Sequence, residues 1–266
     1  MTKRGWGSVG IVVVLAAMVG VGCSSGSKVR SDSGPAVESS TTTKAGEEKE
    51  STTTVADASP ATSSALAISG TVTIPDGEAG KLSIVLTGKP EAQRGTVPVV
   101  VRNRTSDSVY SIEVNGTARS ADGALVGSGS SQGVTPSEVG PGEWAFGYVY
   151  FDSDLPTDAS FDLTATGSTD SGFLASVDGT IAEYNVAPGS YGTDVIGIVS
   201  NDTDAEISGP VSVDLMCFDG AGTAPVSTSG SYTDGDSIPA GGTSSFSLSL
   251  PDNCANFALG ASGYST

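Results

Sequence analysis

Histidine is absent from all 266 residues of the chain. It is the commonest general base and metal ligand in proteins, so its absence excludes a Ser-His-Asp triad, a Cys-His pair and zinc sites built on cysteine and histidine. No Gly-x-Gly-x-x-Gly or Walker-type phosphate loop occurs either. We therefore name no catalytic, cofactor-binding or metal-ligating residue, and we expect a protein that is not an enzyme.

Positive charge is absent from the second half of the chain. All 12 Lys and Arg lie at or before Arg119, whereas residues 120–266 contain 19 Asp and Glu. A surface this acidic repels nucleic acid and anionic lipid head groups, so we expect no nucleic-acid partner. The acidity is typical of a soluble exported protein; a cation-binding surface and a basic partner are the alternatives.

Paired carboxylates are the one catalytic option left, as in glycoside hydrolysis. Residues 233–237 look like part of a calcium loop, but they lack the remaining ligands and the closing Glu of the EF-hand pattern. We expect hairpin turns there and at residues 152–154. Trp144 is the only tryptophan after the first 22 residues, so aromatic platforms for sugar stacking are scarce.

The N-terminus has the layout of an export signal. Lys3 and Arg4 give a positive start, residues 9–21 are apolar, and small residues surround Cys23. A cysteine in this position resembles the lipobox of bacterial lipoproteins, in which the signal is cut before the cysteine and the thiol is diacylated. The resemblance implies a signal peptide over residues 1–22 and a lipidated Cys23 as the mature N-terminus, although Gly20 stands where that family usually has Leu.

Two other interpretations of this segment remain open. An uncleaved membrane anchor is disfavoured because the apolar run is shorter than the ~18 residues of a spanning helix. An ordinary secretory cleavage site would make Cys23 incidental. Since two acyl chains hold a protein stably on a bilayer, we expect the chain at the cell membrane, lipid-anchored and facing the extracytoplasmic side.

Residues 23–67 form a low-complexity linker dominated by Ser, Thr, Ala and Gly. Its apolar residues are too sparse to bury a core, so we expect a disordered tether. A flexible coil of about 44 residues spans roughly 35 Å. The tether would lift the folded part off the membrane.

The chain has three cysteines, and acylation of Cys23 leaves Cys217 and Cys254 as a pair. An exported protein lies in an oxidising compartment, where an even pair of cysteines indicates a disulfide. Two separately buried thiols are the alternative.

Beyond residue 67 the sequence consists of short alternating apolar segments separated by turn residues. It lacks long runs of helix formers with a 3.6-residue period, which predicts an all-β body. For residues 109–118, a continuous strand and a hairpin at Asn115-Gly116 both remain open. The other expected strands cover residues 68–74, 81–86, 97–103, 211–218 and 244–250.

An internal repeat relates two parts of this body. Residues 97–105 line up with residues 195–203, at an offset of 98. Three further pairs follow in the same order: residues 120–123 with 217–220, residues 139–142 and Phe146 with residues 238–242 and Phe246, and residues 161–167 with 257–263. This period fits the ~100 residues of an immunoglobulin-like sandwich. We therefore predict two tandem immunoglobulin-like β-sandwich domains, residues 68–168 and 169–266.

The second unit, over residues 192–264, resembles the FxLyD-type domain of bacterial exported lipoproteins. The resemblance rests on the opening strand at residues 197–201, the aromatic-Asp-x-x-Gly-like hairpin at residues 218–220, the Pro-Gly turn at residues 239–242 and Phe246. It is weaker over residues 96–167, where Ala121 replaces the aromatic residue and Val99 replaces the Gly. The resemblance implies an immunoglobulin-like sandwich in an extracytoplasmic setting and transfers no functional residue.

Three functional hypotheses follow. The first is a non-catalytic binding or scaffolding module of the cell envelope, held at the membrane by its lipidated N-terminus, with an envelope protein as a potential partner. The second is a structural envelope lipoprotein without a soluble ligand. The third, disfavoured by the missing chemistry, is a carboxylate-based hydrolase.

Overall fold

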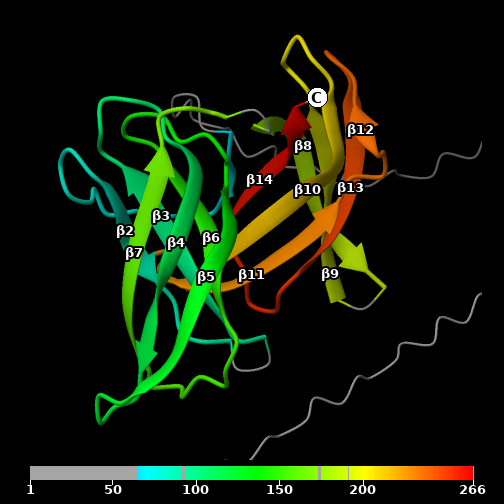
Figure 1. The fold of residues 1–266 in the computed structure, drawn as a ribbon. Coiled ribbons are helices and arrows are strands. Elements are labelled where there is room, and N and C mark those ends of the chain that lie inside the picture. Colours follow the sequence, from blue (N-terminus) through cyan, green and yellow to red (C-terminus); the bar gives the residue numbers. More distant parts are fainter. Residues whose placement is uncertain (1–64, 92–93, 173–174, 191, 266) are drawn as a thin grey trace, which may run out of the picture. The chain divides into compact units, whose positions relative to one another are not determined.

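The computed structural model describes residues 65–91, 94–172, 175–190 and 192–265. The signal peptide, Cys23 and nearly all of the linker lie outside this part, so their assignments stay predictions. The described secondary structure consists of antiparallel β-strands (Figure 1), which confirms the all-β class. Within the described ranges, no helix has the length and apolar character needed to cross a membrane.

The first half of the body forms a six-stranded sheet in the order β2-β3-β6-β5-β4-β7. Its strands are Leu82–Thr87 (β2), Thr96–Asn103 (β3), Tyr110–Arg119 (β4), Leu125–Thr135 (β5), Trp144–Phe151 (β6) and Ser160–Ser168 (β7). Val97, Val99 and Val101 of β3 and Ala145 and Val149 of β6 point into its core from alternate positions, as the period of a strand requires. The range 109–118 is one continuous strand, β4, without a hairpin at Asn115-Gly116.

The second half forms a sheet in the order β11-β10-β14-β8-β9-β13. These strands are Ser176–Gly189 (β8), Gly192–Ser200 (β9), Ile207–Phe218 (β10), Pro225–Tyr232 (β11), Thr243–Leu250 (β13) and Asn256–Ser265 (β14). Two short strands complete it: β12 (Ser237–Ile238) pairs with β10, and β1 (Ala67–Ser69) pairs with β14. The strands predicted at 211–218 and 244–250 are thus confirmed.

The two sheets share one circular strand order, which explains the repeat in the sequence. The edge strands β2 and β7 lie side by side in the first sheet, and β11 and β13 do so in the second. Taken as rings, β2-β3-β6-β5-β4-β7 and β8-β9-β13-β11-β10-β14 match strand for strand. Each ring encloses its own hydrophobic core, so the two β-sandwiches have the same topology. They differ in which neighbouring strands are not hydrogen-bonded to each other: β2 and β7 in the first, β11 and β13 in the second.

A buried asparagine occupies the same place in both sandwiches. Asn103 is the last residue of β3, and its side-chain amide donates to the carbonyls of Asp107 and Val139, each at 2.8 Å. Asn201 follows β9 and donates to the carbonyls of Ala205 and Ile238 at 2.7 and 2.8 Å. In each case the amide oxygen accepts from the backbone N–H and the hydroxyl of the threonine two residues on, at 2.7–3.0 Å. This shared network confirms that residues 97–105 and 195–203 are equivalent.

The match between Phe146 and Phe246 is wrong by one residue. Val99 pairs with Gly147, whereas its equivalent, Gly197, pairs with Phe246. A shift of one residue turns a strand's side chain to the opposite face of the sheet. Phe246 therefore lies inside the second sandwich, and Phe146 points out of the first one.

The strand predicted at residues 68–74 is also corrected. Only Ala67–Ser69 is strand, and it pairs with β14 of the second sandwich instead of opening the first. Gly70 adopts a φ of 71°, a left-handed conformation that ends the strand. The chain then runs past the second sandwich, where Thr71 N–H donates to Asn256 Oδ1 at 2.9 Å and Thr73 N–H donates to the carbonyl of Gly222 at 2.8 Å.

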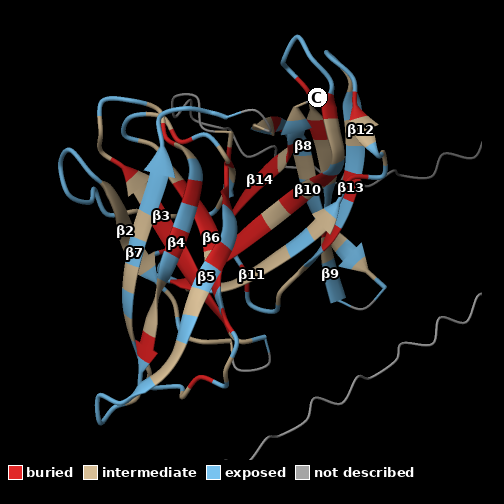
Figure 2. Ribbon diagram, viewed as in Figure 1, coloured by how far each residue is buried: buried red, intermediate tan, exposed pale blue. Residues whose placement is uncertain are grey.

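A third hydrophobic cluster joins the two sandwiches, which belong to one compact unit of the chain. Its buried members come from both halves: Leu66, Val100, Phe146, Met216, Phe218 and Ala258. Trp144 packs against this cluster, with its ring edge-on to that of Phe218 at a centroid distance of 6.3 Å. The last four residues of β10 are consequently buried on both faces (Figure 2).

Candidate binding cleft between the two sandwiches

The outer face of β10 changes character along its length. Val211, Val213, Leu215 and Cys217 point into the second sandwich, as the alternation predicts. The other face begins with Ser212 and Asp214, at the cleft, and ends with Met216 and Phe218, in the third cluster. One end of this face is therefore sealed by apolar contact and the other end is open and polar.

The facing wall is built on β6 and β3 of the first sandwich. Trp144, Phe146, Tyr148 and Tyr150 alternate on the outer face of β6. The first two belong to the shared hydrophobic cluster, and the two tyrosines continue beyond it into the cleft. Thr96, which opens β3, pairs with Tyr150 and lies on the same wall.

The two walls enclose a cleft of about 530 Å³. Hydroxyl groups, glycines and aromatic rings dominate its lining. The lining residues on strands include Thr96, Thr135, Tyr148, Tyr150, Ser212, Asp214, Thr228, Gly230, Tyr232, Ser262 and Tyr264. They come from β3, β5, β6, β10, β11 and β14, so both sandwiches are needed to form the cleft.

Asp214 lies on the wall of the cleft, between two glycines in the neighbouring strands. It pairs with Gly230 of β11 and Gly260 of β14. Its Oδ2 accepts from the hydroxyl of Thr135 in the first sandwich at 2.8 Å, and from Ser212 at 3.3 Å. A Cβ on Gly230 would lie 2.9 Å from Asp214 Oδ1, so the glycine leaves that oxygen room. Burial raises the pKa of Asp214, and the two hydroxyl donors oppose the rise.

Tyrosine side chains stand at the rim. Tyr150 is 49% exposed on one wall, while Tyr232 and Tyr264 are 63% and 51% exposed on the other. Tyr232 and Ser262 flank Ser212 on the neighbouring strands, so a hydroxyl row runs across β11, β10 and β14. The rings present apolar faces and phenolic hydroxyls to whatever enters.

Thr96, on the wall formed by β3 and β6, has a buried hydroxyl that lacks a hydrogen-bond partner among the described residues. Thr96 is 7% exposed, and its hydroxyl oxygen is buried without a partner. Buried hydroxyls are normally hydrogen-bonded, because leaving one unpaired costs free energy. Thr96 thus offers an unused donor and acceptor at the cleft.

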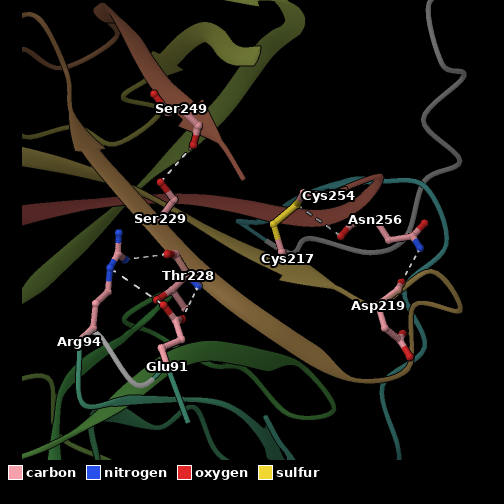
Figure 3. The surroundings of a disulfide bond; sticks show 9 residues. All are labelled: Glu91, Arg94, Cys217, Asp219, Thr228, Ser229, Ser249, Cys254 and Asn256. Atoms are coloured by element: carbon pink, nitrogen blue, oxygen red, sulfur yellow. Dashed lines mark hydrogen bonds and ion pairs between the residues drawn. A yellow bond between two sulfur atoms is a disulfide. The ribbon is translucent and has the colours of Figure 1, made fainter. Parts of the chain in front are cut away.

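Polar contacts between the sandwiches fix the walls relative to each other. Asp178 of β8 accepts from the backbone N–H groups of Ser137 at 2.8 Å and Glu138 at 3.1 Å. Burial raises the pKa of Asp178, while these N–H donors oppose the rise. On the other side Arg94 donates to the carbonyl of Thr228 at 3.0 Å, and Thr228 N–H donates to Glu91 Oε1 at 3.2 Å (Figure 3). The cleft is therefore held open by contacts at both flanks.

The predicted disulfide is confirmed. Cys217 of β10 is bonded to Cys254, which follows β13, with a Cα–Cα distance of 5.5 Å (Figure 3). Both cysteines lie in the core of the second sandwich. The nearby Asn256 donates to the carbonyl of Asp219 at 2.8 Å. The disulfide and this hydrogen bond together connect β10 and the loop after it to the segment that leads into β14.

The acidic segments considered in the sequence lie in bends of the connections from β11 to β12 and from β6 to β7. The strands joined by each connection do not pair with each other, so the hairpin turns expected there are wrong. In residues 233–237, the Asp234 carboxylate accepts from the Ser245 hydroxyl. In residues 152–154, Ser153 donates to the carbonyl of Val126 at 3.0 Å. Over the ranges that the structure describes, no group of three or more Cys, Asp or Glu is placed to hold a metal ion. Cys23 lies outside those ranges.

The cleft was not predicted from the sequence, although one signal for it is present there. A sandwich strand with one face in the core should carry polar residues on the other face. The outer face of β6 instead carries Trp144, Phe146, Tyr148 and Tyr150. Four aromatic residues on an outward face indicate a second contact surface.

No family model matches the chain, and neither a curated protein nor a solved structure matches it. The resemblance to the FxLyD-type domain therefore stays a prediction.

Proposed function

We propose that this protein is a non-catalytic binding module of the cell envelope, anchored through a lipidated Cys23 on the extracytoplasmic side. The observation that carries the proposal is the cleft of about 530 Å³ between the two sandwiches. Clefts of this size that are already formed, and that combine aromatic rings with a few polar groups, are typical ligand sites.

The lining of the cleft supports binding over catalysis. Asp214 is the one carboxylate among the described residues that line it. Glycoside hydrolysis uses a pair of carboxyl groups, so the cleft lacks the second group that a carboxylate-based hydrolase needs. The hydroxyl groups around Asp214 have no histidine or lysine beside them to act as a base.

We also propose that the chain is an FxLyD-type lipoprotein. In support, Gly197 and Phe246 are a cross-strand pair, and a Cβ on Gly197 would lie 2.7 Å from the phenyl ring. Asp219 opens the loop after β10 by accepting from the N–H groups of Thr223 at 2.7 Å and Ala224 at 3.2 Å. These contacts give the motif residues structural roles.

The anchor is tested by replacing Cys23 with Ser and fractionating the cells. We expect the wild type in the membrane fraction and Cys23→Ser in the soluble exported fraction, because the variant cannot be acylated. Equal membrane retention of the two proteins would show that another element anchors the chain.

The binding role is tested by sedimenting purified chain with cell-envelope fragments. We expect the wild type to co-sediment saturably, the double variant Tyr150→Ala/Tyr232→Ala to lose most of that binding, and Leu125→Ala to keep it. Leu125 is a suitable control because it is 61% exposed and lies away from the cleft lining. Equal binding by all three proteins would favour the structural lipoprotein without a soluble ligand.

A further inference from the structure

We infer that the cleft binds an uncharged carbohydrate chain, with sugar rings stacked on its tyrosines and sugar hydroxyls bonded to Asp214, Thr96 and the serines beside them. The inference rests on the proposed binding function and names the ligand class.

Tyrosine rings supply the stacking surface for sugars that tryptophan does not. Tryptophan is scarce, but four of the chain's seven tyrosines line this one cleft: Tyr148, Tyr150, Tyr232 and Tyr264. The C–H groups on the face of a pyranose ring are apolar and pack against the face of an aromatic ring, while a phenolic hydroxyl can bond to a sugar hydroxyl. Tyrosines on both walls can contact a chain that runs between them.

The polar groups match a ligand with many hydroxyls. Thr96 has a buried hydroxyl without a partner among the described residues. Ser212 and Ser262 add hydroxyls that both donate and accept, and Asp214 adds a carboxylate beside Gly230, which has no side chain to cover it. A sugar hydroxyl is itself donor and acceptor, so it can satisfy any of these groups.

The charges of the cleft favour an uncharged ligand. Arg94 is the one cationic side chain among the described lining residues, and it is already bonded to the carbonyl of Thr228 and lies 4.0 Å from Glu91. An anionic ligand would meet Asp214 and a chain of net charge −18. An organic cation would use the tyrosines and Asp214, but it would leave the buried hydroxyl of Thr96 unpaired.

The experiment uses the full chain, purified in a detergent without sugar groups. It is applied to immobilised neutral hexasaccharides of glucose, mannose, galactose, arabinose, xylose and N-acetylglucosamine, with spermidine, tetramethylammonium and inorganic phosphate as charged probes in solution. We expect saturable binding of at least one hexasaccharide and no saturable binding of the charged probes.

Matched variants locate the binding. Tyr150→Ala and Tyr232→Ala should each weaken it by about tenfold or more through loss of a stacking surface, whereas Tyr150→Phe and Tyr232→Phe should stay within about threefold, because the ring remains. Leu125→Ala should bind as the wild type does. Thermal melts of all variants show that each is folded.

Several outcomes would overturn the inference. They are the absence of saturable binding to every hexasaccharide, binding that the alanine variants leave unchanged, and saturable binding of a charged probe that the alanine variants abolish. Sedimentation with envelope fragments separates this failure from that of the proposed function. If envelope binding is lost in Tyr150→Ala/Tyr232→Ala while no neutral hexasaccharide binds, the ligand class is wrong and the binding role stands; if envelope binding is also unaffected, both fail.

Discussion

The two sandwiches share one strand order and one buried asparagine network, yet they are stabilised differently. The second has a disulfide and a short extra strand from residues 67–69, whereas the first has neither. Strand pairing places Ala118 where the second sandwich has Cys217, since Ala118 pairs with Phe161 and Cys217 with Phe257. This corrects the sequence alignment, which set Ser120 against Cys217. The two sandwiches thus share their topology and their buried asparagine network, whereas the disulfide belongs to the second sandwich alone.

The two sandwiches also pack against each other through their outer faces. Met216 and Phe218 belong by sequence to the outer face of β10, and both are buried against the first sandwich. The expected division at residues 168–169 falls between β7 and β8, so it separates the two sheets. The shared cluster nevertheless predicts that the two units depend on each other for stability.

The largest effect is expected from Phe218→Ala, which opens the shared cluster. Loss of a buried phenylalanine costs about 3–5 kcal/mol of unfolding free energy. We expect both sandwiches to be destabilised together, with a change in the fluorescence of Trp144, whose ring lies 6.3 Å from that of Phe218. Denaturation followed by fluorescence and by circular dichroism checks this; destabilisation of the second sandwich alone would show two independent domains.

Removal of the disulfide should destabilise the second sandwich more than the first. The cysteines are 37 residues apart, and the chain-entropy estimate for closing such a loop is about 4 kcal/mol. In Cys217→Ala/Cys254→Ala we expect amide hydrogen exchange to accelerate most in β9, β10 and β13, and less in β3 and β6. Equal acceleration in both halves would mean that the shared cluster transmits the whole loss.

The asparagine pair tests whether equivalent networks carry equal free energy. Asn103→Ala and Asn201→Ala each remove four hydrogen bonds at a fully buried side chain, and each should cost about 3 kcal/mol. The exposed Asn115→Ala is the control and should be nearly neutral. Urea denaturation measures the three values, and a clear difference between the first two would break the equivalence.

Two matching glycines should respond unequally. A Cβ on Gly263 would lie 2.6 Å from a methyl group of Ile207 and 2.7 Å from the carbonyl oxygen of Ser208, whereas on Gly167 the close contact is with a methyl group of Val109 and the nearest carbonyl is 3.1 Å away. A side chain can adjust more readily than backbone. Thermal melts should show Gly263→Ala destabilised by about 2 kcal/mol and Gly167→Ala by about 1 kcal/mol; the reverse order would contradict this packing.

The smallest effect concerns pH and the carboxylates between the sandwiches. Burial raises the folded-state pKa of Asp214 above its unfolded value. The folded state then binds protons more readily, so this contribution to stability is present below the unfolded pKa, about 3.9, and is lost as pH rises through the folded pKa. We expect wild type to gain stability relative to Asp214→Asn on acidification from neutral pH to about pH 4. A pH-independent difference in urea denaturation would contradict it.

Much of the fold was predictable from local chemistry. The period-2 alternation of residues 211–218 and 244–250 identified β10 and β13, because a strand with one face in a core must alternate. The disulfide was predicted from an even cysteine pair in a chain whose N-terminus has the layout of an export signal. The repeat was detected because the Asn and Thr at residues 103, 105, 201 and 203 make the same local bonds in both halves.

Only the tertiary structure decided what the outer faces do. The alternation at Asp214 and Met216 marks both as outward, but one lines a cleft and the other is buried, because a second sandwich covers part of the face. The one-residue displacement of Phe146 from Phe246 was equally hidden, since it depends on strand register across the sheet. Short-range patterns determine which face of a strand a side chain takes. What lies opposite that face is set by residues more than a hundred positions away, as Thr228 and Glu91 are.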